Sequence, residues 1–591
     1  MAASAPEAAP APLPPPAATV DREALAAIRE ACERGEPRCD RVALLSRLER
    51  RAVERVVADR GLELEPSPQG RRIRRVVIVN QDVFGPADGF LRWFNLFHVT
   101  SREEVVAREL VIGAGEPWDD RKADESLRRL RDALFTSLAA IVAVRTDDPD
   151  QVDLLCVTRD VWSLRLNSNY ELQQSQLTYL SFALSENNLF GARKLLAASF
   201  KMDQGAYTMG PLYIDKNLLG RHLDLRGTGG PIFNRQSGHL EGSQSTLQLS
   251  YPLWTLTQDW GAGLEVSHRF AVERSFRGTG LRTYDAPETP VDDLLPYQYQ
   301  QRRIDVAASV VRAFGSAVEQ RVRGGYELAV RRPSLVDGFP ADPVLIEAFT
   351  RDVLPRSERT SSLFVGYQLF EPRYRNFQDV DTFELAEDTQ MGVAADVKLS
   401  AALGLLGSEH DFLRVAASAS YTGQLGADGL WKVKVAGSTR LEGGEAVDDV
   451  AEVNLRLVAP TFEVGRVVSQ LRVAGLFRDR QNQFYTLGGD NGLRGYPVGE
   501  LSGDRVAVWN TELRTHAVPV WFMRWGLLAF YDVGGADASL RTMQLHHDAG
   551  LGLRILTPQF NPEVYRFDFA FGLDGDRRGE FRFIGGYTQA F

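Results

Sequence analysis

The segment LGGDNGLRGYP, Leu487–Pro497, carries the clearest structural signal in this chain of 591 residues. It is rich in glycine, and strand-length segments with alternating apolar and polar residues follow it. Counted back from the C-terminus, those segments cover approximately 580–591, 563–573, 546–556, 522–533 and 504–516. Leu487–Pro497 is therefore predicted to be a loop between the fifth and the sixth strand from the end.

Two of these segments show the alternation most plainly. In segment 563–573, one face would carry Tyr565, Phe567, Phe569 and Phe571, and the other Arg566, Asp568, Ala570 and Gly572. In the last, one face would carry Phe581, Phe583, Gly585, Tyr587, Gln589 and Phe591. Such strands have two chemically different environments on their two sides.

After Asp160 the helical signals nearly vanish, and alternation alone fits a sandwich, a propeller or a barrel. At roughly 27 residues per strand and loop, residues 161–591 make about 16 strands, and so large a sheet must close or split. The chain has no apolar run of about 18 residues, so no membrane-spanning helix is expected. The net charge of -10 and mean hydropathy of -0.22 still fit a membrane barrel, which buries only alternate residues in lipid.

A short motif recurs near the start of this region. Asn188-Leu189-Phe190-Gly191 is echoed 29 residues later by Asn217-Leu218-Leu219-Gly220. The distance suits one hairpin repeat, and the alternative is a coincidence of common turn residues.

The residues before the barrel divide into three predicted parts. Residues 1–20 are an Ala/Pro-rich stretch with nothing large to bury, which predicts a disordered linker. Residues 21–70 are predicted to be a short helical preface. Residues 71–160 are predicted to be an α+β domain with the order strand, helix, helix, strand, strand, in which Ser101 and Glu104 form a capping box.

Several motifs in this order resemble the BamA family of outer-membrane assembly barrels, which includes TamA and the two-partner-secretion transporters. They are the Arg494-Gly495-Tyr496 triplet, WNTELR at Trp509–Arg514, FYDVG at Phe530–Gly534 and the final Phe591. NLFHVTSREEVVARELVIGAGEPWD and DESLRRLR resemble a periplasmic POTRA domain. The resemblance implies a mainly β fold, namely a 16-stranded antiparallel transmembrane barrel preceded by a POTRA-like domain, with the triplet between strands 11 and 12. One such domain instead of several leaves the branch of the family open.

The triplet predicts a specific contact inside the barrel. A loop that folds back into the lumen needs an anchor, and an arginine beside two inward carboxylates supplies one. We therefore expect Arg494 to lie near Glu512 and Asp532. Gly495 would let the backbone approach the wall, and Tyr496 would pack beside it. Phe530 and Gly534 flank Asp532 in the strand-13 motif. The alternative to an anchored lumen loop is a solvated surface loop that merely carries an arginine.

The barrel terminal signal consists of the four aromatic residues Phe581, Phe583, Tyr587 and Phe591. The last strand must close against the first, which is predicted within 163–175, and an aromatic end at the membrane interface would fix its depth. The resemblance implies that this seam is a lateral gate; the alternative is a permanently paired seam. It also implies that edges of the POTRA-like domain bind client strands, and the alternative there is a rigid spacer.

The sequence contains no familiar catalytic motif, so no enzyme, catalytic residue, cofactor or metal site is predicted. The adjacent His546 and His547 would point to opposite faces of a strand. Cys32 and Cys39 could pair in an oxidising compartment. The acidic charge balance argues against nucleic-acid binding, and no signal peptide is visible at the start.

Three functions are compatible with these observations. The first, implied by the resemblance, is an insertase or translocase in the outer membrane of a Gram-negative bacterium, with its POTRA-like domain in the periplasm. Its partners would be outer-membrane lipids, unfolded or secreted protein clients, and periplasmic chaperones or accessory subunits. The second is a dedicated secretion pore or channel in which loop 487–497 is a lumen plug. The third is a soluble all-β adhesion or scaffold protein.

Overall fold

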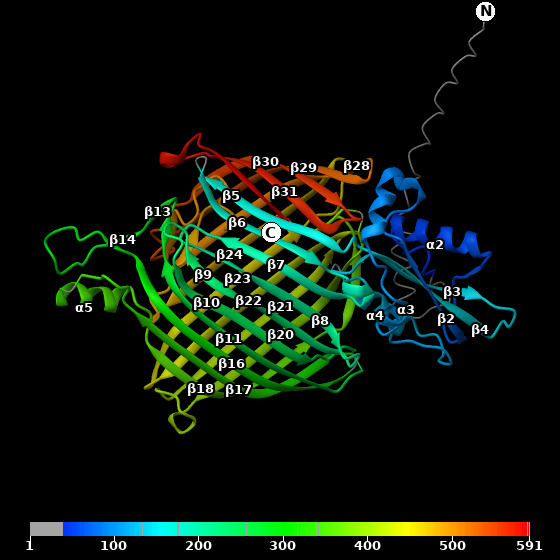
Figure 1. Ribbon diagram of the computed structural model, residues 1–591, viewed down its shortest axis with the longest axis horizontal. Helices are drawn as coiled ribbons and strands as arrows, with labels where there is room; N and C mark the ends of the chain where they lie inside the picture. The colour runs from blue at the N-terminus through cyan, green and yellow to red at the C-terminus, as the bar shows by residue number, and fades with distance from the viewer. Residues whose placement is uncertain are drawn as a thin grey trace, which may run out of the picture.

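The computed structural model describes residues 40–591 except 133, 174, 175, 256, 316, 341, 384, 588 and 590. It contains an N-terminal α/β unit, residues 40–160, and a closed antiparallel β-barrel that begins at Leu164. Figure 1 shows the unit beside one end of the barrel, with helix α5 (Pro343–Asp352) at the opposite end. No helix among the described residues has the length and apolar content needed to cross a membrane.

The N-terminal unit is a four-stranded sheet with helices on both faces. The strand order is β1-β3-β4-β2, and β2 runs parallel to β4. The strands are β1 (Leu64–Glu65), β2 (Arg72–Gln81), β3 (Thr136–Arg145) and β4 (Gln151–Asp160). The helices are α2 (Arg47–Arg60), the 3-10 segment η1 (Pro86–Phe97), α3 (Glu103–Ala107) and α4 (Asp120–Leu130). The order β2, α3, α4, β3, β4 matches the predicted order of strands and helices.

Strand β3 forms the centre of the unit because both of its faces are apolar. Leu138, Ala140 and Val142 pack with α2, whereas Ala139 and Ile141 pack on the α3 and α4 side. A strand covered on both faces has a nearly continuous apolar sequence instead of an alternating one.

Helix α2 ends at Arg60 with Gly61 as its C-cap, where the sequence predicted a helix end, and its Val53 and Val56 pack directly on the sheet. One local prediction in this region is wrong. Ser101 does not cap α3, whose N-cap is Arg102 with no side-chain hydrogen bond. The Ser101 hydroxyl instead contacts Asn188 and Arg193 of the barrel. A capping box does form at α2, between Ser46 and Glu49.

The barrel has 20 strands among the described residues, not the 16 that were predicted. They are β5 (Leu164–Gln173), β6 (Gln176–Glu186), β7 (Lys194–Met202), β8 (Ala206–Leu218), β9 (Leu223–Asn234), β10 (Leu240–Tyr251), β11 (Trp260–Arg274), β16 (Gln298–Phe314), β17 (Glu319–Ser334), β18 (Glu358–Phe370) continued by β19 (Arg373–Phe377), β20 (Glu387–Ala402), β21 (Phe412–Leu425), β22 (Gly429–Glu442), β23 (Glu445–Val458), β24 (Gly465–Phe477), β27 (Arg505–Thr515) continued by β28 (Val518–Val520), β29 (Met523–Asp537), β30 (His546–Thr557), β31 (Asn561–Gly572) and β32 (Phe581–Tyr587). The assumed spacing was too long because many turns are short; β22 ends at Glu442 and β23 begins at Glu445.

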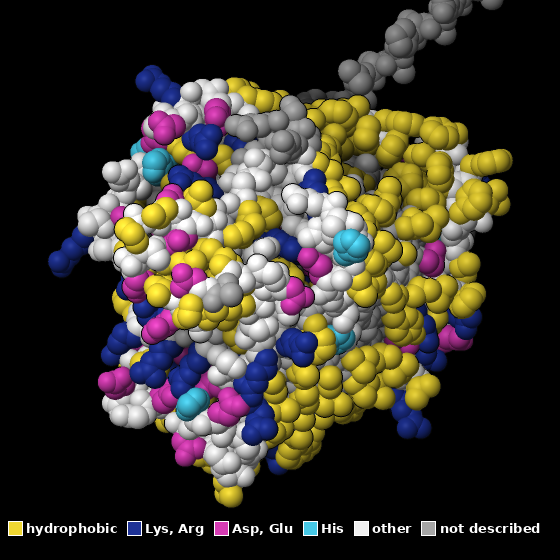
Figure 2. All heavy atoms as spheres, turned by 60° about the vertical axis from the view of Figure 1, so that its left-hand side comes forward, with side chains coloured by type: hydrophobic (Ala, Val, Ile, Leu, Met, Phe, Trp, Pro, Cys, Tyr) yellow, Lys and Arg dark blue, Asp and Glu magenta, His cyan; other side chains and the backbone are white. Residues whose placement is uncertain are grey.

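The outer face of the barrel is apolar. Large apolar side chains are exposed at outward-facing positions along the strands, including Leu247, Val365, Leu399, Val435, Leu455, Leu527, Leu551 and Phe569. Figure 2 shows hydrophobic side chains covering the barrel wall on the right of the view, and charged side chains gathered on the left. A continuous apolar band of this extent is unfavourable in water and is typical of a barrel that spans a membrane. The band disfavours the soluble-scaffold interpretation.

The echoed motif forms the same turn twice. Residues 188–191 join β6 to β7, and residues 217–220 join β8 to β9. In each turn the asparagine Oδ1 accepts a hydrogen bond from the backbone five residues later, Arg193 N at 2.9 Å and His222 N at 2.8 Å. The prediction of a hairpin repeat is confirmed by this geometry.

Candidate functional site: the lumen loop, the seam and the joint

The connection between β24 and β27 folds back into the barrel. It contains a small antiparallel hairpin of β25 (Tyr485–Leu487) and β26 (Leu501–Gly503). The segment Leu487–Pro497, which starts at the last residue of β25, is called the lumen loop below. Along β27 the even-numbered residues are buried and Trp509 and Leu513 are exposed. The even positions therefore face the lumen, where the Asn510 Nδ2 atom donates to Gly492 O at 2.7 Å.

Arg494 contacts three carboxylates that line the lumen; these four residues are called the Arg494 cluster. The guanidinium donates to Asp532 through Nε at 2.7 Å and through Nη2 at 2.8 Å. Its Nη1 donates to Glu512 at 2.6 Å and to Asp568 at 3.2 Å. All four side chains are almost fully buried. The structure thus brings together the arginine and the two acidic residues expected from the sequence.

Asp568 is a cluster member that sequence reasoning missed. Its carboxylate also accepts from Arg554 Nη1 at 2.6 Å and from Arg566 Nε at 2.7 Å. The alternation along β31 placed Asp568 on the face opposite the phenylalanines, and that was the available signal. Charge-assisted contacts in a buried site are strong only when each charged group is paired. Asp568 meets this condition because it connects Arg494 to two further guanidinium groups, those of Arg554 and Arg566.

Phe530 and the two glycines shape the space around the cluster. The Phe530 ring lies 3.6 Å from the Arg494 guanidinium carbon, which is a close cation–π contact. A Cβ on Gly495 would lie 2.5 Å from the Asp548 Cβ and 2.9 Å from the Gly572 nitrogen. At Gly534 a Cβ would lie 2.8 Å from the Ala507 carbonyl oxygen. Only glycine allows such close approach of the backbone to its neighbours.

Tyr496 fixes the other side of the lumen loop. Its ring is buried with Leu487, Leu493, Val506 and Val508, and its hydroxyl donates to the Asp574 carboxylate. The lumen loop is therefore held by polar contacts at Arg494 and by an apolar contact at the adjacent aromatic residue.

The two adjacent histidines lie on different sides of β30. The His546 ring packs 5.4 Å from the Tyr496 ring in the lumen, whereas His547 contacts the hydroxyl of Tyr531, which is exposed on the outer face. Among the described residues no group of histidine, cysteine and acidic side chains could hold a metal ion. Cys32 and Cys39 lie outside the described residues.

The prediction that Phe591 lies at the membrane interface is wrong. Its ring packs in the lumen beside Leu430, Val458 and Val468, and its carbonyl oxygen accepts from Arg514 Nη2 at 3.2 Å. Val468 is directly opposite Glu512 in the sheet, which places this contact on the lumen face. The chain leaves the ladder after Tyr587, so alternation no longer sets the direction of the last side chain, and an apolar patch with arginine donors receives it.

The seam between the last and the first strand is short. Residues 583–585 of β32 pair with residues 170–172 of β5, whereas β5 pairs with β6 over its full length from Leu164 to Gln173. The closure within 163–175 is confirmed. Phe581 is exposed on the outer face, and the Phe583 ring lies 5.9 Å from that of Tyr170 across the seam. Tyr587 is the final residue of β32.

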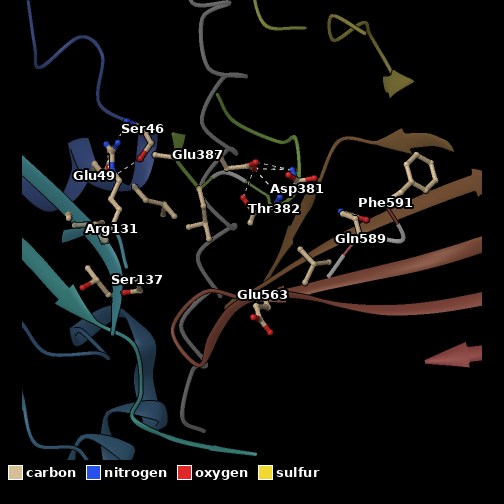
Figure 3. A pocket seen from close by; sticks show the side chains of 17 residues that line it. Ser46, Glu49, Arg131, Ser137, Asp381, Thr382, Glu387, Glu563, Gln589 and Phe591 are labelled. Atoms are coloured by element: carbon tan, nitrogen blue, oxygen red, sulfur yellow. Dashed lines mark hydrogen bonds and ion pairs between the residues drawn. The ribbon is translucent and has the colours of Figure 1, made fainter. Parts of the chain in front are cut away.

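A cavity of about 480 Å³ separates the N-terminal unit from the barrel. Figure 3 shows its walls, with Ser46, Glu49 and Arg131 on one side and Asp381, Thr382, Glu387 and Phe591 on the other. Arg131 spans the two parts, because its Nη2 donates to Glu49 at 2.9 Å and its Nη1 to Asp388 at 3.2 Å.

Asp160 forms the centre of the joint between the unit and the barrel. This buried carboxylate accepts from the Ser101 backbone at 2.6 Å and lies 3.4 Å from His98 Nε2 and 3.7 Å from Arg193 Nη2. Burial, the largest single effect, acts to raise the pKa of Asp160. The contacts with His98, Arg193 and the Ser101 N–H outweigh it, so the pKa is lowered from its usual value.

No protein-family model and no curated protein matches this chain. Solved structures with a similar arrangement include BamA from Haemophilus ducreyi lacking POTRA domains 1–3 (13% identity, 92% of this chain and 93% of that one, TM-score 0.34). They also include CdiB from Acinetobacter baumannii (11%, 96% and 98%, 0.37) and CdiB from Escherichia coli (11%, 87% and 76%, 0.41). With TM-scores below 0.5, these likenesses identify neither a family nor a function.

Proposed function

We propose that this chain is an outer-membrane barrel of the BamA and two-partner-secretion type, which inserts proteins into the membrane or exports them across it. The observation that carries the proposal is the short seam. Among the described residues, the β5–β32 register joins residues 170–172 of β5 to residues 583–585, whereas β5 pairs with β6 from Leu164 to Gln173. A short ladder opens more easily than a long one, and a strand edge that opens at membrane depth readily accepts another strand, because lipid offers no hydrogen bonds.

The N-terminal unit suits the role of receiving a client. It is connected directly to β5 and lies at the end of the barrel where the seam begins. In the proposed orientation this end is periplasmic, and the unit acts as a POTRA domain. Strand β2 lies at one edge of its sheet and offers a site for β-augmentation.

The test is a reversible lock across the seam. Residues 170 and 585 are directly opposite, so Tyr170→Cys with Gly585→Cys should form a disulfide in a Cys32→Ser, Cys39→Ser background. The locked protein in liposomes should no longer accelerate folding of a urea-denatured eight-stranded barrel, and reduction should restore the rate.

The matched control is a lock one strand away. Phe569→Cys with Phe583→Cys joins directly opposite residues of β31 and β32 and should leave the rate unchanged. Equal activity of the oxidised and reduced seam variants would contradict insertion through the seam.

A dedicated secretion pore is the second candidate, and the buried lumen loop favours it. The Arg494 cluster holds this loop inside the lumen. If the loop is a plug, deleting 489–496 should raise the conductance of single proteins in a planar bilayer, and the seam lock should leave export of the substrate intact.

A further inference from the structure

Segment η1 exposes a row of large apolar side chains on the N-terminal unit. Phe90, Trp93, Leu96, Phe97 and the nearby Val99 are between 57% and 74% exposed. A soluble domain rarely leaves so many aromatic and aliphatic side chains together in water. Neither the barrel core nor the Arg494 cluster uses them.

The opposite side of η1 is fixed to the barrel. Leu91 is buried with Val83 and Phe84, and Phe94, Trp162, Phe522 and Phe560 pack against this group. Asn95 ties the segment to the backbone of Phe84, donating through Nδ2 at 2.9 Å and accepting at Oδ1 at 3.1 Å. The exposed row therefore keeps a defined direction relative to the barrel wall.

The row continues the apolar outer face of the barrel. The Phe90 ring lies 5.4 Å from that of Trp521, in the turn between β28 and β29. Trp521, Val518 and Val520 are themselves exposed, and Figure 1 shows β28 at the barrel end next to the N-terminal unit. The exposed apolar surface thus runs from the wall onto η1.

We propose that η1 lies in the interfacial layer of the lipid leaflet next to the N-terminal unit and anchors this unit to the membrane surface. Tryptophan and phenylalanine favour this layer, and amphipathic segments bury their apolar face there. Arg92, the only basic residue of η1, is exposed and can extend to lipid headgroups. The inference requires that the barrel spans a membrane, but it is independent of the transport function.

Site-specific labels in the full-length protein test this placement. In the Cys32→Ser, Cys39→Ser background, Trp93→Cys and Phe97→Cys carry an environment-sensitive fluorophore, and the protein is placed in phosphatidylcholine/phosphatidylglycerol nanodiscs. The control is Asp147→Cys, an exposed site on the β3–β4 turn, which extends away from the barrel. Heat-modifiable migration in gels confirms a closed barrel in each variant.

Both η1 labels should show blue-shifted emission. Lipids brominated near the headgroup should quench this emission, whereas iodide in the buffer should quench it less than it quenches the label at 147. Labels at 93 and 97 that respond to iodide as strongly as that at 147, and not to brominated lipid, would overturn the proposal. That outcome would leave a second protein as the occupant of this surface.

Discussion

Arg494 and Asp532, 38 positions apart in the chain, face each other inside the barrel through two parallel hydrogen bonds of 2.7 and 2.8 Å. The planar guanidinium matches the two carboxylate oxygens, and a lysine could not reproduce this geometry. The pair joins a loop at one end of the barrel to the wall strand β29. It therefore fixes where the loop lies, in addition to neutralising buried charge.

Replacing Arg494 by alanine should release the lumen loop. The change leaves three buried carboxylates without their shared cation, and breaking a buried pair in this way costs about 3–5 kcal/mol. We expect a closed barrel with higher conductance and faster proteolysis within 487–497, and a smaller change for Arg494→Lys. Arg541→Ala, at an exposed loop position, is the control. Unchanged conductance in the alanine variant would contradict a positional role for Arg494.

Asp568 should be energetically coupled to Arg494. In a double-mutant cycle of Asp568→Asn and Arg494→Ala, the effects on denaturant unfolding should not add, with a coupling of about 0.5–3 kcal/mol. Asp568→Asn with Arg541→Ala should be additive, because no contact joins these two sites. Additivity in both cycles would mean that the 3.2 Å contact of Arg494 with Asp568 contributes nothing.

Gly495→Ala should displace the lumen loop although it removes no interaction. The new Cβ would lie 2.5 Å from the Asp548 Cβ and 2.9 Å from backbone atoms, so the loop must move. Conductance and protease sensitivity should change in the direction seen for Arg494→Ala. In Gly263→Ala on β11, where the nearest atom would be 3.6 Å away, both should stay at the level of the unaltered protein.

The joint at Asp160 should depend on pH only in the acidic range. Because its pKa in the folded protein is lowered, the stabilisation by its charge is fully present above the ordinary aspartate pKa of about 3.9. It is lost as the pH falls through the lowered value. Spin labels at Asp147→Cys and Arg541→Cys should report one distance distribution from pH 7 to 5 and a broader one well below pH 4.

Asp160→Asn should broaden that distribution already at pH 7, because it removes the negative charge 3.7 Å from Arg193 Nη2. A distribution in this variant that equals that of the parent at every pH would show that Asp160 does not hold the two parts together.

The alternation of residues predicted the end of the barrel well, because each strand there has one lipid face and one lumen face. Strands β27, β29, β30, β31 and β32 begin within three residues of their predicted positions, and the burial along β31 follows the predicted faces. Glu512 and Asp532 were expected to face inward because their segments resemble the strand-12 and strand-13 motifs of the BamA family. Alternation along β31 also placed Asp568 on the face opposite the phenylalanines, but no motif drew attention to that position.

Other features depend on contacts that a local pattern does not encode. The strand count requires turn lengths, and these vary along the chain. Phe591 follows the last ladder pair, so its side chain responds to an apolar patch on a distant wall and not to alternation. The exposed apolar row on η1 and the packing of α2 on the sheet likewise depend on how separate segments pack.

The repeated turns give the N-terminal unit two separate supports on the barrel. At the first, Arg102 N donates to Gly191 O at 3.0 Å; at the second, Lys216 beside the Asn217 turn pairs with Asp132. The Arg131–Asp388 pair adds a third support on another part of the rim. Because the three supports lie on three different segments of the barrel, a tilt of the unit would strain these contacts. A load applied to the unit would therefore be divided among β6–β9 and β20.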